Sequence, residues 1–156
     1  MLRQLNDSLS HLILETPSPN GERQRGTVSD VWRLPYPTFA FATGDVDGDG
    51  IVDALVGVVK PTRYDPRMGR RLFVFRNVNG RVRPLWLGSR LVGELRDFRV
   101  EGQRVVTLEQ HPDSTWFVGH YRWDSFGFVM TDSRITHASY DAATQVFRPD
   151  SISRSH

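Results

Sequence analysis

Short apolar blocks, each about the length of a β-strand, recur along this sequence and are separated by residues that favour turns. The blocks are rich in Phe, Val, Trp and Leu. The segments between them contain Asp-Gly, Lys-Pro, Asn-Gly and His-Pro-Asp, which are typical of turns between antiparallel strands. This pattern predicts an all-β fold, an antiparallel meander of about 8–10 strands. The best-defined predicted strands span residues 38–43, 54–59, 72–78, 82–87, 104–108, 115–122 and 126–131.

The length of the chain and its first residues add three expectations. A chain of 156 residues is long enough for one domain with a real core and too short for two ordinary ones, so a single β domain over residues 1–156 is expected. Four leucines at helical spacing predict a short helix within residues 2–14, and these are Leu2, Leu5, Leu9 and Leu12. No membrane span is expected, because no apolar run approaches the roughly 18 residues that a span requires.

Two segments of the chain resemble each other at a constant offset of 44 residues. LFVFRNVNGRVRPLWLGSRL (72–91) aligns without a gap with WFVGHYRWDSFGFVMTDSRI (116–135), with four identities in twenty positions. The turn dipeptide Asn79-Gly80 aligns with Trp123-Asp124, and a further apolar strand precedes each segment. This repeat predicts two four-stranded units, which are typical of propeller blades. The units are expected at 38–91 and 94–135, with a two-strand partial unit within 12–34 and a C-terminal tail over 136–156.

The way in which such a sheet closes stays open at this stage. A closed propeller normally needs at least four blades, whereas this chain holds about two and a half. A partial propeller, a sandwich or a barrel would each be consistent with the pattern. Two chains could also complete each other as a homo-oligomer, or the sequence could be a piece of a longer protein.

The acidic stretch GDVDGDGIVD places four carboxylates in one short loop, at its positions 1, 3, 5 and 9, and these are Asp45, Asp47, Asp49 and Asp53. Gly50 at position 6 permits a sharp reversal, and the carbonyl of Ile51 stands at position 7. Oxygen ligands at this spacing suit a hard cation such as Ca²⁺, although a hairpin turn with a solvated acidic tip is the alternative. An EF-hand is not expected, because Val56 occupies position 12 and both flanks have strand character.

The motif DVDGDGIVD followed by ALVGV resembles the calcium loop of FG-GAP or VCBS repeats, the blade units of integrin-α-like β-propellers. By that resemblance the calcium ligands would be Asp45, Asp47, Asp49, the backbone of Ile51, and Asp53. The motif covers about 20 residues, and the blade pattern extends the resemblance loosely to about 100. The second unit has Asp97, Glu101 and Gly102 but lacks a D-x-D-x-D series, so a single site is expected.

Positive charge is concentrated between Lys60 and Arg104, where twelve basic residues stand against four acidic ones. Nearly all of these basic residues are arginines, which suit bidentate contact with carboxylate, phosphate or sulfate groups. Arg81 and Arg83 are candidate ligand contacts, but they alternate with apolar residues along a predicted strand, so a solvated sheet face is the other interpretation. Trp123 is expected to be exposed at its hairpin tip, where it could stack on a sugar ring or a nucleobase.

Catalytic motifs give little support for an enzyme. The densest polar cluster is the loop 109–114, with Glu109, His111, Asp113 and Ser114, which could supply a general acid and base but is also an ordinary polar hairpin loop. The five histidines are scattered, no nucleophile or phosphate-loop motif is present, and the absence of cysteine excludes cysteine-ligated zinc. No catalytic residue is therefore assigned.

The sequence favours a non-enzymatic, calcium-binding β-repeat module that mediates protein or glycan binding. An extracellular, periplasmic or cell-surface location is expected, where millimolar calcium would fill such a loop; the N-terminus lacks the apolar core of a signal peptide, so secretion would require that the signal has been removed. A nucleic-acid partner is not expected. The alternative is a hydrolytic or polyanion-binding domain that uses the basic segment 60–104 and the loop 109–114.

Overall fold

The structure is a computed structural model that describes residues 1–16, 26–61, 66–88 and 91–148. Its elements follow the chain in the order β1 (Leu2–Asn6), β2 (Leu9–Thr16), β3 (Thr27–Leu34), β4 (Thr38–Gly44), β5 (Asp53–Lys60), β6 (Gly69–Val78), β7 (Arg81–Leu87), β8 (Glu94–Glu101), β9 (Arg104–Gln110), β10 (Trp116–Asp124), β11 (Gly127–Ala138) and α1 (Tyr140–Phe147).

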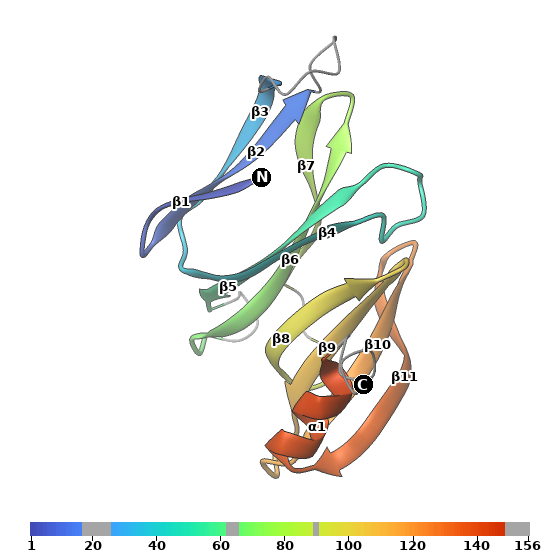
Figure 1. The fold of residues 1–156 in the computed structure, drawn as a ribbon. Coiled ribbons are helices and arrows are strands. Elements are labelled where there is room, and N and C mark those ends of the chain that lie inside the picture. The colour runs from blue at the N-terminus through green and yellow to red at the C-terminus, as the bar shows by residue number, and fades with distance from the viewer. Residues whose placement is uncertain (17–25, 62–65, 89–90, 149–156) are drawn as a thin grey trace, which may run out of the picture.

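These strands form three antiparallel sheets, each with its strands in chain order (Figure 1). Sheet A consists of β1–β3, sheet B of β4–β7 and sheet C of β8–β11. The predicted all-β class is confirmed, with eleven described strands where about 8–10 were expected. Sheets B and C are the two four-stranded meanders that the internal repeat predicts.

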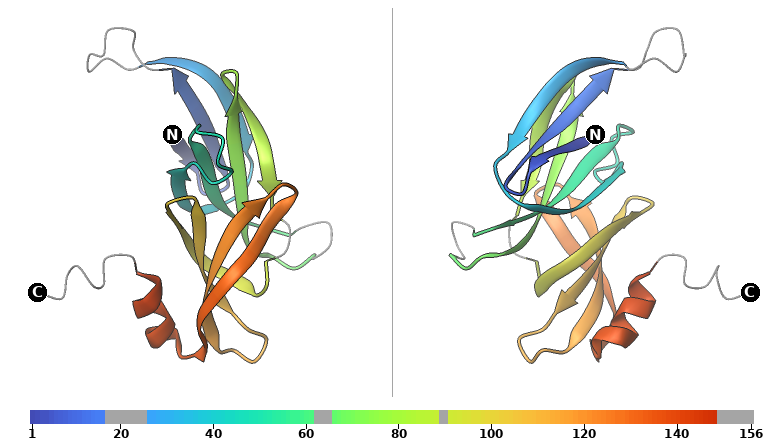
Figure 2. Two further views of the ribbon diagram at one scale, coloured as in Figure 1. Left: turned by 90° about the vertical axis from the view of Figure 1, so that its right-hand side faces the viewer. Right: turned by 60° about the vertical axis from the view of Figure 1, so that its left-hand side comes forward.

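The sheets and α1 pack face against face in one stack (Figure 2). The core between sheets A and B contains Leu12, Leu34, Val56, Val58, Phe73, Phe75 and Val82. The core between sheets B and C contains Val46, Leu55, Leu72, Val74, Leu95, Phe98, Val105, Tyr121 and Phe128. On the other face of sheet C, α1 packs against the strands through Val106, Leu108, Val118, Ala143 and Phe147.

Strand β6 shows why the apolar blocks contain several apolar residues in succession. Leu72 and Val74 belong to the core shared with sheet C, while Phe73 and Phe75 belong to the core shared with sheet A. Successive side chains of a strand point to opposite faces, so a strand covered on both faces needs an apolar residue at nearly every position.

Equivalent positions of the repeat show what covers the outer face of sheet C. Val74 of sheet B faces sheet C, and Val118, its partner in the repeat, faces α1. Helix α1 therefore occupies the position relative to sheet C that sheet C occupies relative to sheet B. The described strands form no closed barrel, and the stack ends in sheet A on one side and in α1 on the other.

The helix predicted within residues 2–14 is wrong, because β1 and β2 form a hairpin there. The turn of this hairpin is stabilised by the N–H of Ser8, which donates a hydrogen bond to Oδ1 of Asn6 (2.8 Å). Strand β2 pairs with β3 as well, and Leu12 is buried against sheet B. These long-range pairings outweigh the local helical spacing of the leucines. Sheet A consequently has three strands rather than the predicted two.

The hairpin of sheet C turns two residues later than the gapless alignment predicts. Asp124 pairs with Gly127, so the turn lies at Ser125 and Phe126 rather than at Trp123-Asp124. Trp123 therefore lies within β10 and is half-buried, and its predicted exposure at the tip is wrong. Phe126, which is 96% exposed, occupies the tip instead.

The C-terminal tail predicted over 136–156 is partly regular structure, since β11 extends to Ala138 and α1 follows; residues 149–156 lie outside the described residues. Ser139 is the N-cap of α1, and its side chain accepts a hydrogen bond from the N–H of Ala142 (3.2 Å). Asp141 in the first turn is favourable to the helix dipole. The sequence pattern that indicates this helix is the N-cap residue Ser139 followed by apolar residues at positions 143 and 147.

Asp30 on β3 connects sheet A to sheet B through a hydrogen bond. Its Oδ2 accepts a hydrogen bond from the N–H of Val82 on β7 (2.8 Å). That N–H and the N–H of Val31 hold the pKa of Asp30 below its ordinary value of 3.8. The stabilisation by the ionised carboxylate is thus present above pH 3.8 and is lost as the pH falls through the lower folded-state pKa.

We expect Asp30→Asn to lower the midpoint of urea unfolding near neutral pH, because the amide is a weaker acceptor for these two N–H groups. The difference from the parent protein should shrink as the pH falls below 3.8 and disappear once the pH is below the lowered folded-state pKa, where Asp30 itself becomes neutral. Asp124→Asn, an exposed change at the far hairpin of sheet C, serves as the control. A difference between parent and Asp30→Asn that is independent of pH would contradict the proposed role of the charge.

Candidate metal site

The aspartate loop, residues 45–53, connects β4 to β5 (Figure 1). Gly44 pairs with Asp53 where the two strands enter the loop. Val46 is 2% exposed and anchors the loop in the core between sheets B and C. A Cβ on Gly48 would lie 3.6 Å from Oε1 of Gln103, so the loop also lies against the β8–β9 turn of sheet C. Both sheets therefore support the loop.

Asp45 organises the course of the loop. Its Oδ1 accepts hydrogen bonds from the N–H groups of Gly48 (2.9 Å) and Asp49 (3.2 Å), and its Oδ2 accepts one from Gly50 (2.8 Å). Partial burial works in the opposite direction, but these donors hold the pKa of Asp45 below its ordinary value. Gly48 and Gly50 have φ angles of 78° and 84°, which residues with a Cβ rarely adopt, so the turn requires glycine.

Asp45, Asp47 and Asp49 each offer one carboxylate oxygen, and these three oxygens lie within 4.8 Å of one another. Oxygens that bind one Ca²⁺ at about 2.3–2.6 Å are separated by at most about 5.2 Å, so the triad fits around a single ion. Burial, together with the neighbouring carboxylates of Asp49 and Asp45, raises the pKa of Asp47. A cation between the three groups would relieve this repulsion.

Asp53 lies beneath the triad and is 1% exposed. Its Oδ2 accepts hydrogen bonds from the N–H groups of Val46 (2.9 Å) and Asp47 (3.3 Å), whereas its buried Oδ1 has no hydrogen-bond partner within the described chain. Burial raises the pKa of Asp53 to about 7, and the nearby Asp47 carboxylate adds to the rise. A buried carboxylate oxygen without a partner is costly. Asp53 does not belong to the group whose carboxylate oxygens lie within 4.8 Å of one another, so its role as a fourth ligand stays a prediction.

The donor set as a whole suits a hard cation. Every candidate ligand is a carboxylate or a carbonyl oxygen, which Ca²⁺, Mg²⁺ and Mn²⁺ prefer over nitrogen or sulfur. The N–H of Ile51 donates to Oδ1 of Asp49 (2.9 Å), and the role of the Ile51 carbonyl as a ligand stays a prediction. The structure thus brings together Asp45, Asp47 and Asp49 as a group that could hold a metal ion.

The three residues predicted as weak ligand contacts lie on two different sheets. Arg81 and Arg83 are exposed on β7, the edge strand of sheet B. Trp123 belongs to sheet C, where its ring contacts Trp86 (centroids 6.3 Å apart) and Phe128 (5.2 Å). The described contacts of Trp123 are therefore those of a packing residue between sheets B and C.

The loop 109–114 is divided between the core and the surface. Glu109 is fully buried: its Oε1 accepts a hydrogen bond from the N–H of Gly93 (2.7 Å), and its Oε2 accepts one from the hydroxyl of Tyr121 (2.7 Å) and one from Thr107. Burial, followed by the Glu109 charge, raises the pKa of Tyr121 far above its ordinary value and keeps the hydroxyl a donor. This network joins the segment before β8 to sheet C.

His111 and Asp113 lie on the turn between β9 and β10. The ring of His111 stacks on Phe117 and on His137, with centroids 4.3 Å apart in both pairs. Oδ2 of Asp113 is 3.2 Å from Nδ1 of His137. His137 comes from the end of β11, and no local sequence signal placed it here. Within the described chain, no hydrogen bond connects this histidine pair to Glu109.

Comparisons of the chain with known protein families, with curated proteins and with solved structures found no match. Among the described residues, no helix combines the length and the apolar character that a membrane crossing demands. The resemblance of the aspartate loop to FG-GAP and VCBS repeats therefore rests on its own residues.

Replacing Glu109 tests whether its role is structural. Glu109→Ala would leave the N–H of Gly93 and the buried hydroxyl of Tyr121 without their acceptor, so we expect a loss of stability on the order of 3 kcal/mol in urea unfolding. Glu94→Ala is the matched control, because the Glu94 side chain is 60% exposed and its replacement should cost no more than about 0.5 kcal/mol. Equal effects of the two substitutions would contradict the importance of the buried network.

Proposed function

We propose that this chain is a non-enzymatic, calcium-binding β-repeat module that presents a surface to a protein or glycan partner. The observation that carries the proposal is the convergence of three carboxylate oxygens within 4.8 Å, above the buried Asp53 with its unpartnered Oδ1. The FG-GAP-like spacing of these residues supports calcium as the ion. Asp45, Asp47, Asp49 and Asp53 would hold it, and it would supply charge neutralisation and order to the loop.

The surface beside the loop supports a role in binding. Ile51 and Val52 are 45% and 61% exposed, although both are apolar. A loop ordered by an ion would hold these side chains in one conformation, so that a partner would pay less entropy to bind them. Extracellular or periplasmic calcium, at millimolar concentration, would fill a loop of modest affinity, so we place the protein outside the cytoplasm.

Thermal unfolding in EDTA and in graded Ca²⁺ tests the proposal. Calcium that binds only the folded chain should raise the melting temperature, corresponding to about 2.7 kcal/mol at one hundred times the dissociation constant. Asp47→Ala should abolish this calcium-dependent rise, because the triad loses one oxygen ligand. In EDTA, where no ion is bound, the same substitution should change the melting temperature far less. Mg²⁺ at equal concentration should give a smaller shift, since it demands a tighter octahedral geometry.

The matched control is Asp97→Ala, which removes an aspartate from β8 outside the loop. This variant should retain the full calcium-dependent rise. Two results would contradict the metal site. One is a parent protein whose melting temperature does not respond to Ca²⁺, and the other is an Asp97→Ala variant that loses the response as Asp47→Ala does. Either result would leave the loop as an acidic turn.

A further inference from the structure

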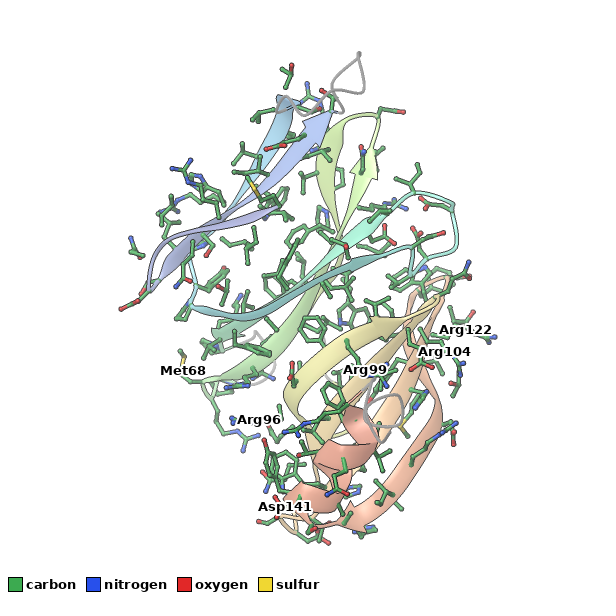
Figure 3. The ribbon with its side chains drawn as sticks, viewed as in Figure 1. Met68, Arg96, Arg99, Arg104, Arg122 and Asp141 are labelled. Atoms are coloured by element: carbon green, nitrogen blue, oxygen red, sulfur yellow. The ribbon has the colours of Figure 1, made fainter. Side chains whose placement is uncertain are left out.

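A cavity of about 440 Å³ lies between sheets B and C, at the end of the sheets opposite to the aspartate loop. Its lining comes from the start of β6, the segment before β8 and the β9–β10 turn, within residues 67–72, 91–95 and 110–114. Figure 3 shows Met68 and Arg96 at this end of the sheets, and Arg104 and Arg122 at the other. The volume is in the range of about 300–1,000 Å³ that is typical of small-molecule sites.

Two arginines of the cavity are held in place by the backbone. The guanidinium of Arg71 donates to the carbonyl oxygens of Lys60 and Arg67, at 3.2 Å in both cases. Arg70 donates through Nη1 to the carbonyl oxygen of Arg96. Side chains that are already fixed lose little rotamer freedom when they bind a ligand. These contacts distinguish Arg70 and Arg71 from arginines that move freely in solvent.

The charged side chains that line the cavity have a positive excess. Among the described lining residues, the charged ones are three arginines, Arg67, Arg70 and Arg71, and one acid, Glu94. Arg67 is 3.4 Å from Glu94, but their side chains are 74% and 60% exposed, so this ion pair contributes little and a competing anion could replace it. The carboxylate of Glu94 shows that an oxyanion can reach a guanidinium at the rim of the cavity.

The wall opposite the arginines is polar and also fixed. Nε2 of Gln110 donates to the carbonyl oxygen of Ser114 (3.2 Å), and His111 is held by its stacking on Phe117. The lining thus combines cationic groups on one side with hydrogen-bonding groups on the other. This combination matches a small hydrophilic ligand with a negative group better than an apolar one.

We propose that this cavity binds a small ligand through an oxyanion group, a carboxylate, sulfate or phosphate, which Arg70 contacts, because Arg70 shares the face of β6 that Leu72 turns toward sheet C. A guanidinium offers paired N–H donors in a plane, which match the oxygens of such groups. The cavity is lined by residues of both the basic segment 60–104 and the polar loop 109–114. The sequence indicated these two segments separately and did not show that they lie side by side. The proposal does not rest on the metal loop, which lies at the other end of the sheets, so each can fail without the other.

Titration of the full chain by NMR or calorimetry tests the cavity. The probes are inorganic sulfate, inorganic phosphate and glucuronate, at constant ionic strength and with EDTA to remove any cation from the aspartate loop. We expect saturable one-to-one binding of at least one probe, with a dissociation constant on the order of millimolar. The preferred probe distinguishes a carboxylate from a sulfate or phosphate as the recognised group.

Three variants locate the binding. Arg70→Gln should weaken it about tenfold or more, through the loss of a charge-assisted hydrogen bond. Glu94→Gln should strengthen it about two- to fivefold, because the competing carboxylate is removed. Arg122→Gln, at the other end of sheet C, should leave it unchanged.

The Glu94→Gln variant keeps the test decisive if Arg70→Gln does not fold, since Glu94 is exposed and its replacement removes no buried contact. Binding of none of the three probes would overturn the proposal. An equal loss in Arg122→Gln and Arg70→Gln would do so as well, because it would mean that anions bind to the positive surface without a site.

Discussion

Burial of apolar side chains on both faces of sheets B and C is the constraint on which the rest of the structure depends. Strand β6 places Phe73 and Phe75 in one core and Leu72 and Val74 in the other, so sheet B requires a cover on each side. Sheet A supplies one cover and sheet C the other, and α1 then covers the outer face of sheet C. The described sheets do not close into a ring, and the stack ends in sheet A on one side and in α1 on the other.

The polar network around Glu109 connects this packing to the cavity. Glu109 binds the N–H of Gly93, and the hydroxyl of Tyr121 accepts a hydrogen bond from the N–H of Val92 (3.2 Å). Val92 and Gly93 belong to the segment that enters sheet C and that lines the cavity. A buried carboxylate with several donors thereby holds the segment before β8 against sheet C, and this segment forms part of the cavity lining. The two candidate sites lie at opposite ends of the same interface, one organised by carboxylates and the other by guanidinium groups.

Local chemistry explains what could be predicted before the structure. The aspartate loop depends on residues within nine positions of one another, so Asp45, Asp47 and Asp49 converge as their spacing indicates. The strands of sheets B and C follow from apolar blocks between turn residues, and the repeat correctly paired Val74 with Val118. The gapless alignment misplaced the second hairpin, because β10 extends to Asp124 and its pairing with Gly127 is decided by register against β11. The spacing of the leucines in residues 2–14 gave a wrong helix prediction for the same reason, because local spacing contains no information about the pairing of β2 with β3.

The sequence by itself determined the all-β class, the two four-stranded meanders and the grouping of Asp45, Asp47 and Asp49 in one loop, because each is encoded over a few neighbouring residues. Only the tertiary structure decided that α1 takes the place of a further sheet, that Glu109 is a buried structural acceptor, and that Arg70 and Arg71 share a cavity with His111. These features join residues about 15 to 40 positions apart, and their geometry arises from sheet packing and loop crossing. Such distances carry no periodic signal that a reading along the chain could detect.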